Sequence, residues 1–371
     1  MSTQTPATIF LGGDVMTGRG IDQILPHPGD PALHEPAVTD ARTYVSLAEQ
    51  ASGSFARPAG FTWPWGDALA VLDDRAPDIR LINLETSITS DGRFAPGKAV
   101  HYRMHPDNLA CLAAARPDVC VLANNHVLDF GPRGLADTLD TLAAAKIAAV
   151  GAGCAAAQAH GPVSVPLSAG GCAVIAAGGM ASSGIPRHWR ATDDRPGVSF
   201  VPDLRARSAD SLAGRALALK RPGDLAIVSL HWGSNWGYTI ASSQVRFARR
   251  LIDAGVDLVH GHSSHHPRPI EVYRGKLILY GCGDLVNDYE GIRGFQDYRG
   301  ELRLMYFATL EPATGALAGL NMVPMKARKL RLRHVPRGDV DCLRSVLERI
   351  SLRFGTRVGT TPDGTLTVCA D

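Results

Sequence analysis

The sequence has almost no excess of charge of either sign. Its 371 residues contain 38 Lys and Arg against 36 Asp and Glu, which gives a formal net charge of +2 at pH 7. Proteins that bind nucleic acid or membrane surfaces nonspecifically need a concentration of cationic side chains. We therefore expect neither nucleic acid nor a membrane as a partner.

The sequence also lacks several motifs that would define other protein classes. Its seven cysteines are odd in number, widely spaced and without a CxxC pair, which argues against a zinc ribbon or a disulfide framework. Residues 1–16 have no basic segment followed by a long apolar one, so we expect a cytoplasmic protein without a membrane anchor. The glycines of residues 12–20 lack the spacing of a phosphate-binding loop or a dinucleotide fingerprint, so no organic cofactor is expected.

Short apolar runs alternate with segments of helical periodicity along most of the chain. Strands are predicted at residues 7–11, 79–82, 119–122, 174–177, 225–230, 256–259 and 277–280, and helices at 43–51, 110–116, 135–145, 244–254 and 341–353. Continuous apolar strands between amphipathic helices indicate an α/β fold whose strands are buried on both faces.

The pattern predicts one large domain, residues 1–322, and a C-terminal extension, residues 323–371, packed on that same domain. The insertion at residues 26–65 is rich in Pro, Gly, His and Asp, which is typical of a lid or a substrate-binding loop. In the extension, cationic and apolar residues alternate over residues 329–333, which predicts a strand with one cationic face.

Metal-binding and proton-transferring side chains follow five predicted strands. They are Asp14 in GGDVMTGRG, Asn83 and Glu85 in INLE, Asn125 and His126 in ANNHVLDFG, His231 in HWG, and His262 and His265 in HGHSSHH. Clustered imidazoles repel one another on protonation unless a metal or carboxylates compensate. The combined pattern therefore indicates a divalent metal with acid–base groups beside it.

The motifs GDVMTGRG, INLET, ANNHVLDFG, HWG and GHSSHH, with Glu271 after them, resemble those of the CapA family. That family is named for poly-γ-glutamate capsule synthesis and is similar in fold to the calcineurin-like metallophosphoesterases. The resemblance runs in the family's order from about Ile9 to Tyr289. It implies a central two-layered β-sandwich flanked by helices, with a metal site at the strand C-termini, which local patterning alone does not distinguish from a doubly wound sheet.

The resemblance also implies roles for individual residues. The positions that match metal ligands are Asp14, Glu85, Asn125, His231 and His262. The first motif reads Asp14-Val15-Met16 and lacks the histidine of a phosphoesterase Asp-x-His motif. A two-metal site is therefore doubtful, and the oxygen-rich ligand set favours one cation, Ca²⁺, Mg²⁺ or Mn²⁺, over Zn²⁺.

Without a predicted anchor, the chain resembles the soluble CapA-like epimerases of lasso-peptide biosynthesis. The main prediction is thus a metal-dependent peptide epimerase that inverts the Cα of a C-terminal, bulky or aromatic residue in a ribosomally made precursor peptide. Such a reaction needs two proton-transferring groups, for which His126 and His265 are the candidates. Asp14 could orient one of them, and Asp284 or Asp129 the other. Two alternatives remain: a metallophosphoesterase or amide hydrolase, and a noncatalytic poly-γ-glutamate capsule assembly protein.

Four further residues are candidates for substrate binding. All five tryptophans lie in loops predicted near the site, and Trp65, Trp232 and Trp236 could form a wall for a bulky side chain or simply cover loop hinges. Arg19 lies nearest to Asp14 in sequence and could bind a substrate carboxylate.

Overall fold

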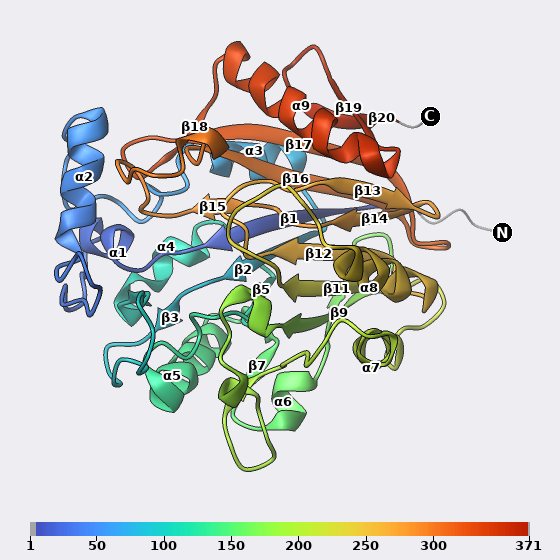
Figure 1. Cartoon of the computed structure of the whole chain (residues 1–371), viewed down its shortest axis with the longest axis horizontal. Coiled ribbons are helices and arrows are strands. Elements are labelled where there is room, and N and C mark those ends of the chain that lie inside the picture. Colours follow the sequence, from blue (N-terminus) through green and yellow to red (C-terminus); the bar gives the residue numbers. More distant parts are fainter. Residues whose placement is uncertain (1–4, 370–371) are drawn as a thin grey trace.

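Two β-sheets packed face to face form the centre of the protein in a computed structural model that describes residues 5–369 (Figure 1). Within those residues, the larger sheet has ten strands in the order β19-β20-β17-β16-β1-β2-β5-β6, with β15 paired to β1 and β18 to β17. Its strands are β1 (Ala7–Val15), β2 (Ile79–Leu84), β5 (Val119–Val121), β6 (Ala148–Val150), β15 (Asp284–Val286), β16 (Leu302–Glu311), β17 (Ala316–Ala327), β18 (Leu332–His334), β19 (Arg357–Thr360) and β20 (Leu366–Cys369).

The second sheet has six strands in the described part of the chain, in the order β13-β14-β12-β11-β9-β8. They are β8 (Val163–Pro166), β9 (Cys172–Gly179), β11 (Leu225–His231), β12 (Leu258–His262), β13 (Ile270–Tyr273) and β14 (Lys276–Leu279). Two short pairs complete the strand set: β3 (Ser87–Ile88) with β4 (Arg103–Met104), and β7 (Ala152–Gly153) with β10 (Gly197–Val198).

The inner faces of the two sheets share one apolar core. Ile9 and Leu11 of β1 belong to the same buried cluster as Ile227 of β11 and Leu258 of β12. The residue between the first two, Phe10, points to the opposite face and belongs to a different cluster, because side chains alternate along a strand. Both faces of each sheet are therefore covered, which explains the continuous apolar runs and confirms the predicted two-layered β-sandwich flanked by helices.

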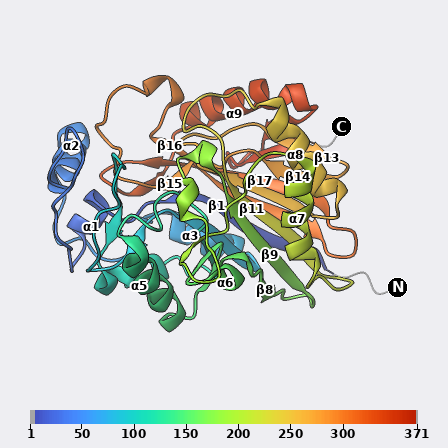
Figure 2. The same cartoon turned by 60° about the horizontal axis from the view of Figure 1, so that its bottom comes forward.

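Helices flank the two sheets, and α9 (Arg337–Ser351) packs against the cluster that the two sheets share (Figures 1 and 2). The other helices are α1 (Gly20–Ile24), α2 (Arg42–Ser52), α3 (Ala68–Arg75), α4 (Leu109–Ala113), α5 (Gly131–Ala144), α6 (Ala156–His160), α7 (Ala206–Leu217) and α8 (Ser242–Asp253). Apolar residues of α1, α3, α4 and α5 join the cluster outside the larger sheet, and those of α7 and α8 join the cluster outside the smaller one. Among the described residues, no helix is both long and apolar enough to span a membrane.

Most of the predicted elements are present, with shifted ends. The strand predicted at 256–259 is β12, which starts at Leu258 and continues to His262. The cationic strand predicted at 329–333 is wrong, because Lys329 and Leu330 adopt positive φ angles of 58° and 53° and β18 begins only at Leu332. The domain boundary placed at residue 322 falls inside β17.

The parallel strands of both sheets end at the same side of the sandwich. β1, β2 and β5 are parallel neighbours in the larger sheet, and β9, β11 and β12 are parallel neighbours in the smaller one. Figure 1 shows the arrowheads of β1, β11 and β12 pointing the same way. The polar residues that follow these strands in sequence consequently collect in one region.

Candidate metal centre and acid–base site

The register of the strands brings distant polar residues together. Asp14 of β1 is paired with Asn83 of β2 on one side and with Asp284 of β15 on the other. The approach of β15 depends on Gly13, because a Cβ atom there would lie 1.7 Å from the carbonyl oxygen of Gly283. Only glycine allows the two segments to come so close.

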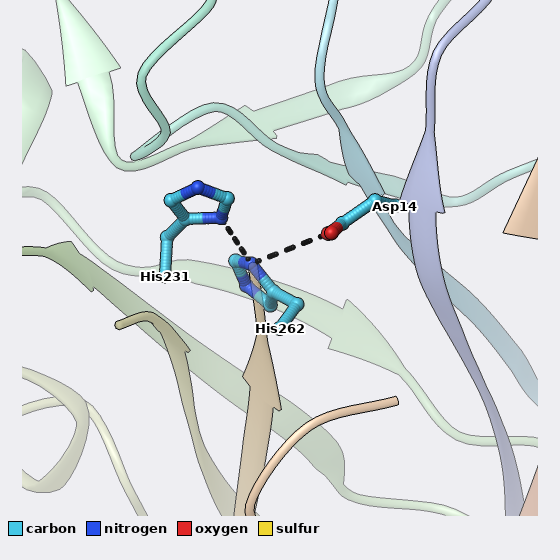
Figure 3. A group of neighbouring side chains, drawn as sticks. All are labelled: Asp14, His231 and His262. Carbon is cyan, nitrogen blue, oxygen red and sulfur yellow. Dashed lines mark hydrogen bonds and ion pairs between the residues drawn. The ribbon is translucent and has the colours of Figure 1, made fainter. Parts of the chain in front are cut away.

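Asp14, His231 and His262 form the centre of the site (Figure 3). One ligand atom from each lies within 4.8 Å of the others, and all three side chains are buried. The Nδ1 atoms of the two histidines are 2.9 Å apart, and His262 Nδ1 lies 3.9 Å from Asp14 Oδ1. Ser263 has a φ angle of 100°, and its backbone N–H donates to Asp14 Oδ2 at 3.2 Å. A strained backbone thus supports the carboxylate.

A chain of hydrogen bonds fixes the tautomer of His262. The carbonyl oxygen of Gly12 only accepts, so His260 Nε2, at 3.0 Å, carries a proton. Burial lowers the pKa of His260 to about 4, so its Nδ1 is unprotonated and accepts from Ser229 Oγ at 3.1 Å. Ser229 has a single proton, and its oxygen therefore accepts from His262 Nε2 at 2.9 Å. Burial also keeps His262 neutral by lowering its pKa, so its Nδ1 lone pair points toward Asp14.

His231 completes this donor arrangement. Its Nε2 lies 2.8 Å from Asn125 Oδ1, an acceptor, which places the proton of His231 on Nε2. The Nδ1 lone pairs of His231 and His262 then face each other across 2.9 Å, a repulsive contact that a shared cation relieves. The donor set of two imidazole nitrogens and one carboxylate therefore fits a divalent metal ion.

The carboxyl groups around this centre lead to the same conclusion. Burial, together with the charge of Asp284, raises the pKa of Asp14 to about 7, and burial and Asp14 raise the pKa of Glu85. A bound cation would lower the energy of these ionised carboxylates. Asp14 also forms a second group of possible ligands with His265 and Asp284.

The five predicted metal ligands lie in one region, but they do not all face one point at which a single cation could contact them. Glu85 and Asn125 lie beside the Nε2 atom of His231, with Glu85 Oε1 at 3.8 Å and Asn125 Oδ1 at 2.8 Å. Asp14 and His262 face the Nδ1 atom of the same ring. The imidazole of His231 therefore stands between two groups of oxygen atoms.

His126 forms a histidine–carboxylate pair at one side of the centre. Its Nδ1 lies 2.6 Å from Asp129 Oδ2, and its Nε2 lies 3.7 Å from Glu85 Oε1. Lys98 contacts both Asp129 and the carbonyl oxygen of Asn125. Burial lowers the pKa of His126 to about 4 despite the charge of Asp129, so its Nε2 is available as a base.

His265 forms the second pair. Its Nδ1 lies 2.9 Å from Asp284 Oδ1, and Asn287 donates to Asp284 Oδ2 at 2.6 Å. Burial lowers the pKa of His265, but the charge and hydrogen bond of Asp284, together with the charge of Asp14, outweigh burial, so the pKa of His265 is raised. The surroundings thus lower the pKa of His126 and raise the pKa of His265, as a base paired with an acid requires.

Two predicted roles need correction. Asp14 accepts from Asn83 Nδ2 at 2.8 Å and orients neither His126 nor His265; Asp129 and Asp284 do so. Arg19 is buried against Glu35 and Asp288, and all three of its nitrogens donate to those carboxylates. Its guanidinium is thus already occupied by protein ligands rather than free for a substrate carboxylate.

The three candidate tryptophans separate into core and cavity residues. Trp65 is fully buried and donates from Nε1 to the carbonyl oxygen of Cys111, and Trp232 is buried and stacked on Tyr280. Neither can form a substrate wall, because the core surrounds both indoles. Trp236 does line a cavity of about 620 Å³, together with His265. Residues of the 26–65 insertion, among them Tyr44, also line this cavity.

Three residues that contact the site were not predicted from the sequence. Lys98 lies in a loop without periodicity, Ser229 lies within the apolar run of β11, and Arg303 lies in a strand of the sheet. Only Arg303 carried a signal, as a cation between the apolar residues Leu302 and Leu304, which is unusual unless the charge has a partner.

A family model described as bacterial capsule synthesis protein PGA_cap matches residues 8–289. The chain belongs to this capsule synthesis family. The match spans every strand end that contributes to the central group, and it confirms the CapA-like resemblance at the level of the family.

The chain is also similar to several curated proteins. A probable polyglutamine synthesis accessory protein of Mycobacterium tuberculosis is 55% identical over 362 residues, covering 97% of this chain and 95% of the relative. The PGA biosynthesis protein CapA of Bacillus subtilis is 29% identical, covering 58% of this chain and 54% of the relative. The capsule biosynthesis protein CapA of Bacillus anthracis is 24% identical, covering 76% of this chain and 60% of the relative.

Proposed function

We propose that this protein is an accessory protein in the synthesis of an amide-linked polymer of glutamate or glutamine units, and that it binds this polymer beside the Asp14–His231–His262 centre. The observation that carries the proposal is the 55% identity, over 97% of the chain, to a probable polyglutamine synthesis accessory protein. The cavity next to His265 supports it, because about 620 Å³ is within the range that holds a small ligand or a few polymer units.

The names of the relatives favour the capsule-assembly alternative over the peptide epimerase. Those named above refer to polyglutamine, PGA or capsule synthesis. The epimerase with a ribosomal precursor peptide as substrate has no support among them and stays a prediction.

A second proposal, that the site hydrolyses amide bonds in the polymer, rests on the two histidine–carboxylate pairs. His126 Nδ1 faces Asp129, so its Nε2 can take a proton from a water molecule whose oxygen attacks the amide carbonyl carbon. As the C–N bond breaks, His265, held by Asp284, donates a proton to the departing nitrogen. A divalent cation at Asp14, His231 and His262 would stabilise the negative charge that develops on the carbonyl oxygen.

The donor set also refines the choice of cation. The central group offers two imidazole nitrogens and one carboxylate, which is richer in nitrogen than the sequence suggests. Imidazole suits Zn²⁺ better than Ca²⁺ or Mg²⁺, while Mn²⁺ accepts both nitrogen and oxygen. We therefore propose Zn²⁺ or Mn²⁺.

The test is to incubate protein loaded with Mn²⁺ or Zn²⁺ with poly-γ-glutamate and, separately, with polyglutamine. Light scattering after size exclusion measures the polymer length and any bound protein, and an amine assay counts new chain ends. Shortened polymer with new amines supports hydrolysis, whereas co-elution with intact polymer supports a noncatalytic accessory role. Failure to bind or cleave either polymer would overturn both proposals. Incorporation of deuterium at the Cα of a peptide substrate in D₂O would instead support the predicted epimerase activity.

A further inference from the structure

Two tyrosines line the cavity beside His265, and their hydroxyl groups are hydrogen-bonded to each other. Tyr102 directly precedes β4, and Tyr289 follows β15. The hydroxyl of Tyr102 donates to the hydroxyl of Tyr289 at 2.9 Å, although the two residues are 187 positions apart in the chain. Tyr102 is buried and Tyr289 is half-buried. The pair therefore forms part of the surface that a ligand in the cavity would contact.

Each tyrosine ring packs against one of the two proton-transferring histidines. The ring of Tyr102 meets the imidazole of His126 edge to face, with centroids 4.5 Å apart. The ring of Tyr289 meets the imidazole of His265 in the same way, with centroids 5.2 Å apart. The two bonded hydroxyls therefore bridge the tyrosines that contact the proposed base and the proposed acid.

The backbone of each tyrosine is held by the same carboxylate system that orients its histidine. The N–H of Tyr102 donates to Asp129 Oδ2 at 2.7 Å, and Asp129 is the partner of His126. The N–H of Tyr289 donates to Asn287 Oδ1 at 3.2 Å, and Asn287 donates in turn to Asp284. The positions of both phenol rings are thus fixed relative to the acid–base groups.

The proton of the Tyr289 hydroxyl has only a weak acceptor among the described residues. Its oxygen accepts from Tyr102, while its own O–H donates to the sulfur of Met16 at 3.8 Å. A thioether sulfur is a poor acceptor. Burial raises the pKa of both phenols, so both hydroxyls keep their protons. A carbonyl oxygen that enters the cavity would therefore replace the sulfur as the acceptor of this proton.

Arg19 makes the phenol protons stronger donors. Its guanidinium carbon lies 4.5 Å from the ring centroid of Tyr102 and 5.8 Å from that of Tyr289. Ion pairs with Glu35 and Asp288 keep the guanidinium in this place. The charge of Arg19 opposes part of the effect of burial on the pKa of both phenols. The nearby cation and the hydrogen bond between the hydroxyls both polarise the Tyr289 O–H group.

We propose that Tyr289 is a catalytic residue whose hydroxyl donates a hydrogen bond to the carbonyl oxygen of the amide bond under attack, and that Tyr102 is the positioning residue that polarises this hydroxyl. The inference rests on the proposed amide hydrolysis. As the water oxygen bonds to the carbonyl carbon, the electron pair of the C=O double bond moves to the carbonyl oxygen. The hydrogen bond from Tyr289 becomes stronger as that negative charge develops. Tyr289 keeps its proton, so both proton transfers remain with the two histidines.

The first test measures the cleavage of poly-γ-glutamate and of polyglutamine by variants that lack a single hydroxyl. Tyr289→Phe should lower kcat about 10²- to 10³-fold with KM nearly unchanged, because the hydrogen bond acts on charge that develops only in the transition state. Tyr102→Phe should lower kcat about 5- to 10-fold, because its hydroxyl acts through Tyr289. The matched control is Tyr306→Phe, which removes a buried hydroxyl that has no hydrogen-bond partner in the described structure, and it should cleave as the parent does.

The second test needs binding but no cleavage. A pentamer of the glutamate or glutamine unit that binds is labelled with ¹³C at its carbonyl carbons and followed by infrared spectroscopy. One carbonyl band should move to lower frequency on binding to the parent, because a donated hydrogen bond weakens the C=O bond. The shift should be smaller in Tyr289→Phe and unchanged in Tyr306→Phe. Thermal melting and a chelator titration of metal affinity check that Tyr289→Phe keeps the fold and the metal centre.

The results distinguish failure of this inference from failure of the proposed function. If Tyr289→Phe cleaves at the parental rate, or only raises KM, the role of Tyr289 is overturned while hydrolysis stands. If the parent binds the polymer without cleaving it, hydrolysis and the catalytic role are overturned. A band shift that depends on Tyr289 would then still support its hydrogen bond to the carbonyl, and an identical shift in Tyr289→Phe would overturn that too. If neither polymer binds, the inference and the proposed function are both overturned.

Discussion

The Nδ1 atoms of His231 and His262 lie 2.9 Å apart, in side chains that occupy paired positions at the ends of two parallel strands. The hydrogen bonds that the two rings donate to Ser229 Oγ and Asn125 Oδ1 place the protons of both rings on their Nε2 atoms. Two lone pairs therefore point into the space that Asp14 also faces. This relationship connects the strand register directly to cation binding.

Asp14→Asn should separate metal binding from folding. The substitution removes a buried carboxyl whose pKa is raised to about 7 by burial and by Asp284, so in the presence of a chelator the variant should melt at the same temperature as the parent or higher. Added Mn²⁺ or Zn²⁺ should raise the melting temperature of the parent but not of the variant. Scanning calorimetry measures both. A parent that gains no stability from any divalent cation contradicts the metal centre.

Ser229→Ala should weaken metal binding without changing a proposed ligand. The hydroxyl fixes the His262 tautomer, and loss of such an outer contact lowers metal affinity by about 10- to 100-fold. Titration with a competing chelator gives the dissociation constant. Ser199→Ala is the matched control, because Ser199 is an equally buried serine that bonds to the carbonyl oxygen of Ala177 instead. Parental affinity in Ser229→Ala argues against the proposed hydrogen-bond chain.

His126→Gln and His265→Gln should abolish most polymer cleavage while retaining polymer binding. Each histidine is assigned a proton transfer, and such a step contributes about 10²- to 10⁴-fold to a rate. Measuring new amine ends against time, with binding followed by calorimetry, distinguishes loss of chemistry from loss of affinity. Unchanged cleavage in either variant removes that histidine from the mechanism.

His266 should make the protein less stable in acid. Burial lowers its pKa to about 4, whereas an unfolded histidine titrates near 6.5. The unfolded chain then binds a proton that the folded chain does not, so the stabilisation is complete above about pH 6.5 and is lost as the pH falls toward 4. The loss is on the order of 3 kcal/mol. His266→Gln should flatten the dependence of the unfolding free energy on pH in this window, whereas substitution of the exposed His334 should not.

Substitution of Trp65 should lower stability, whereas substitution of Trp236 should weaken ligand binding. Trp65→Ala removes a fully buried indole and its hydrogen bond to Cys111, so it should lower the free energy of unfolding by about 3–5 kcal/mol. Trp236 is half-buried and lines the cavity, so Trp236→Ala should weaken polymer binding with a much smaller effect on stability. Chemical denaturation and calorimetry measure the two effects, and equal destabilisation by both would show that Trp236 is a core residue.

The sequence by itself determined part of the strands and helices, together with the motifs that end at the site, but not the long strands β16 and β17. Apolar runs such as residues 225–230 predict β11, and the helical periodicity of residues 135–145 predicts most of α5. These features are local, because burial on both faces of a strand or on one face of a helix is written in consecutive residues. The histidines at strand ends were identifiable for the same reason.

Only the tertiary structure decided which of those residues meet. Asp284 reaches Asp14 through the register of β15 with β1, and Arg303 reaches the acid–base site through Asn287. Trp65 lies in the core although its neighbours in sequence resemble a loop. Such contacts join residues far apart in the chain, and no local pattern encodes them. The chemistry of the site therefore depends on how the two sheets pack, which brings the ends of β1, β11 and β12 together.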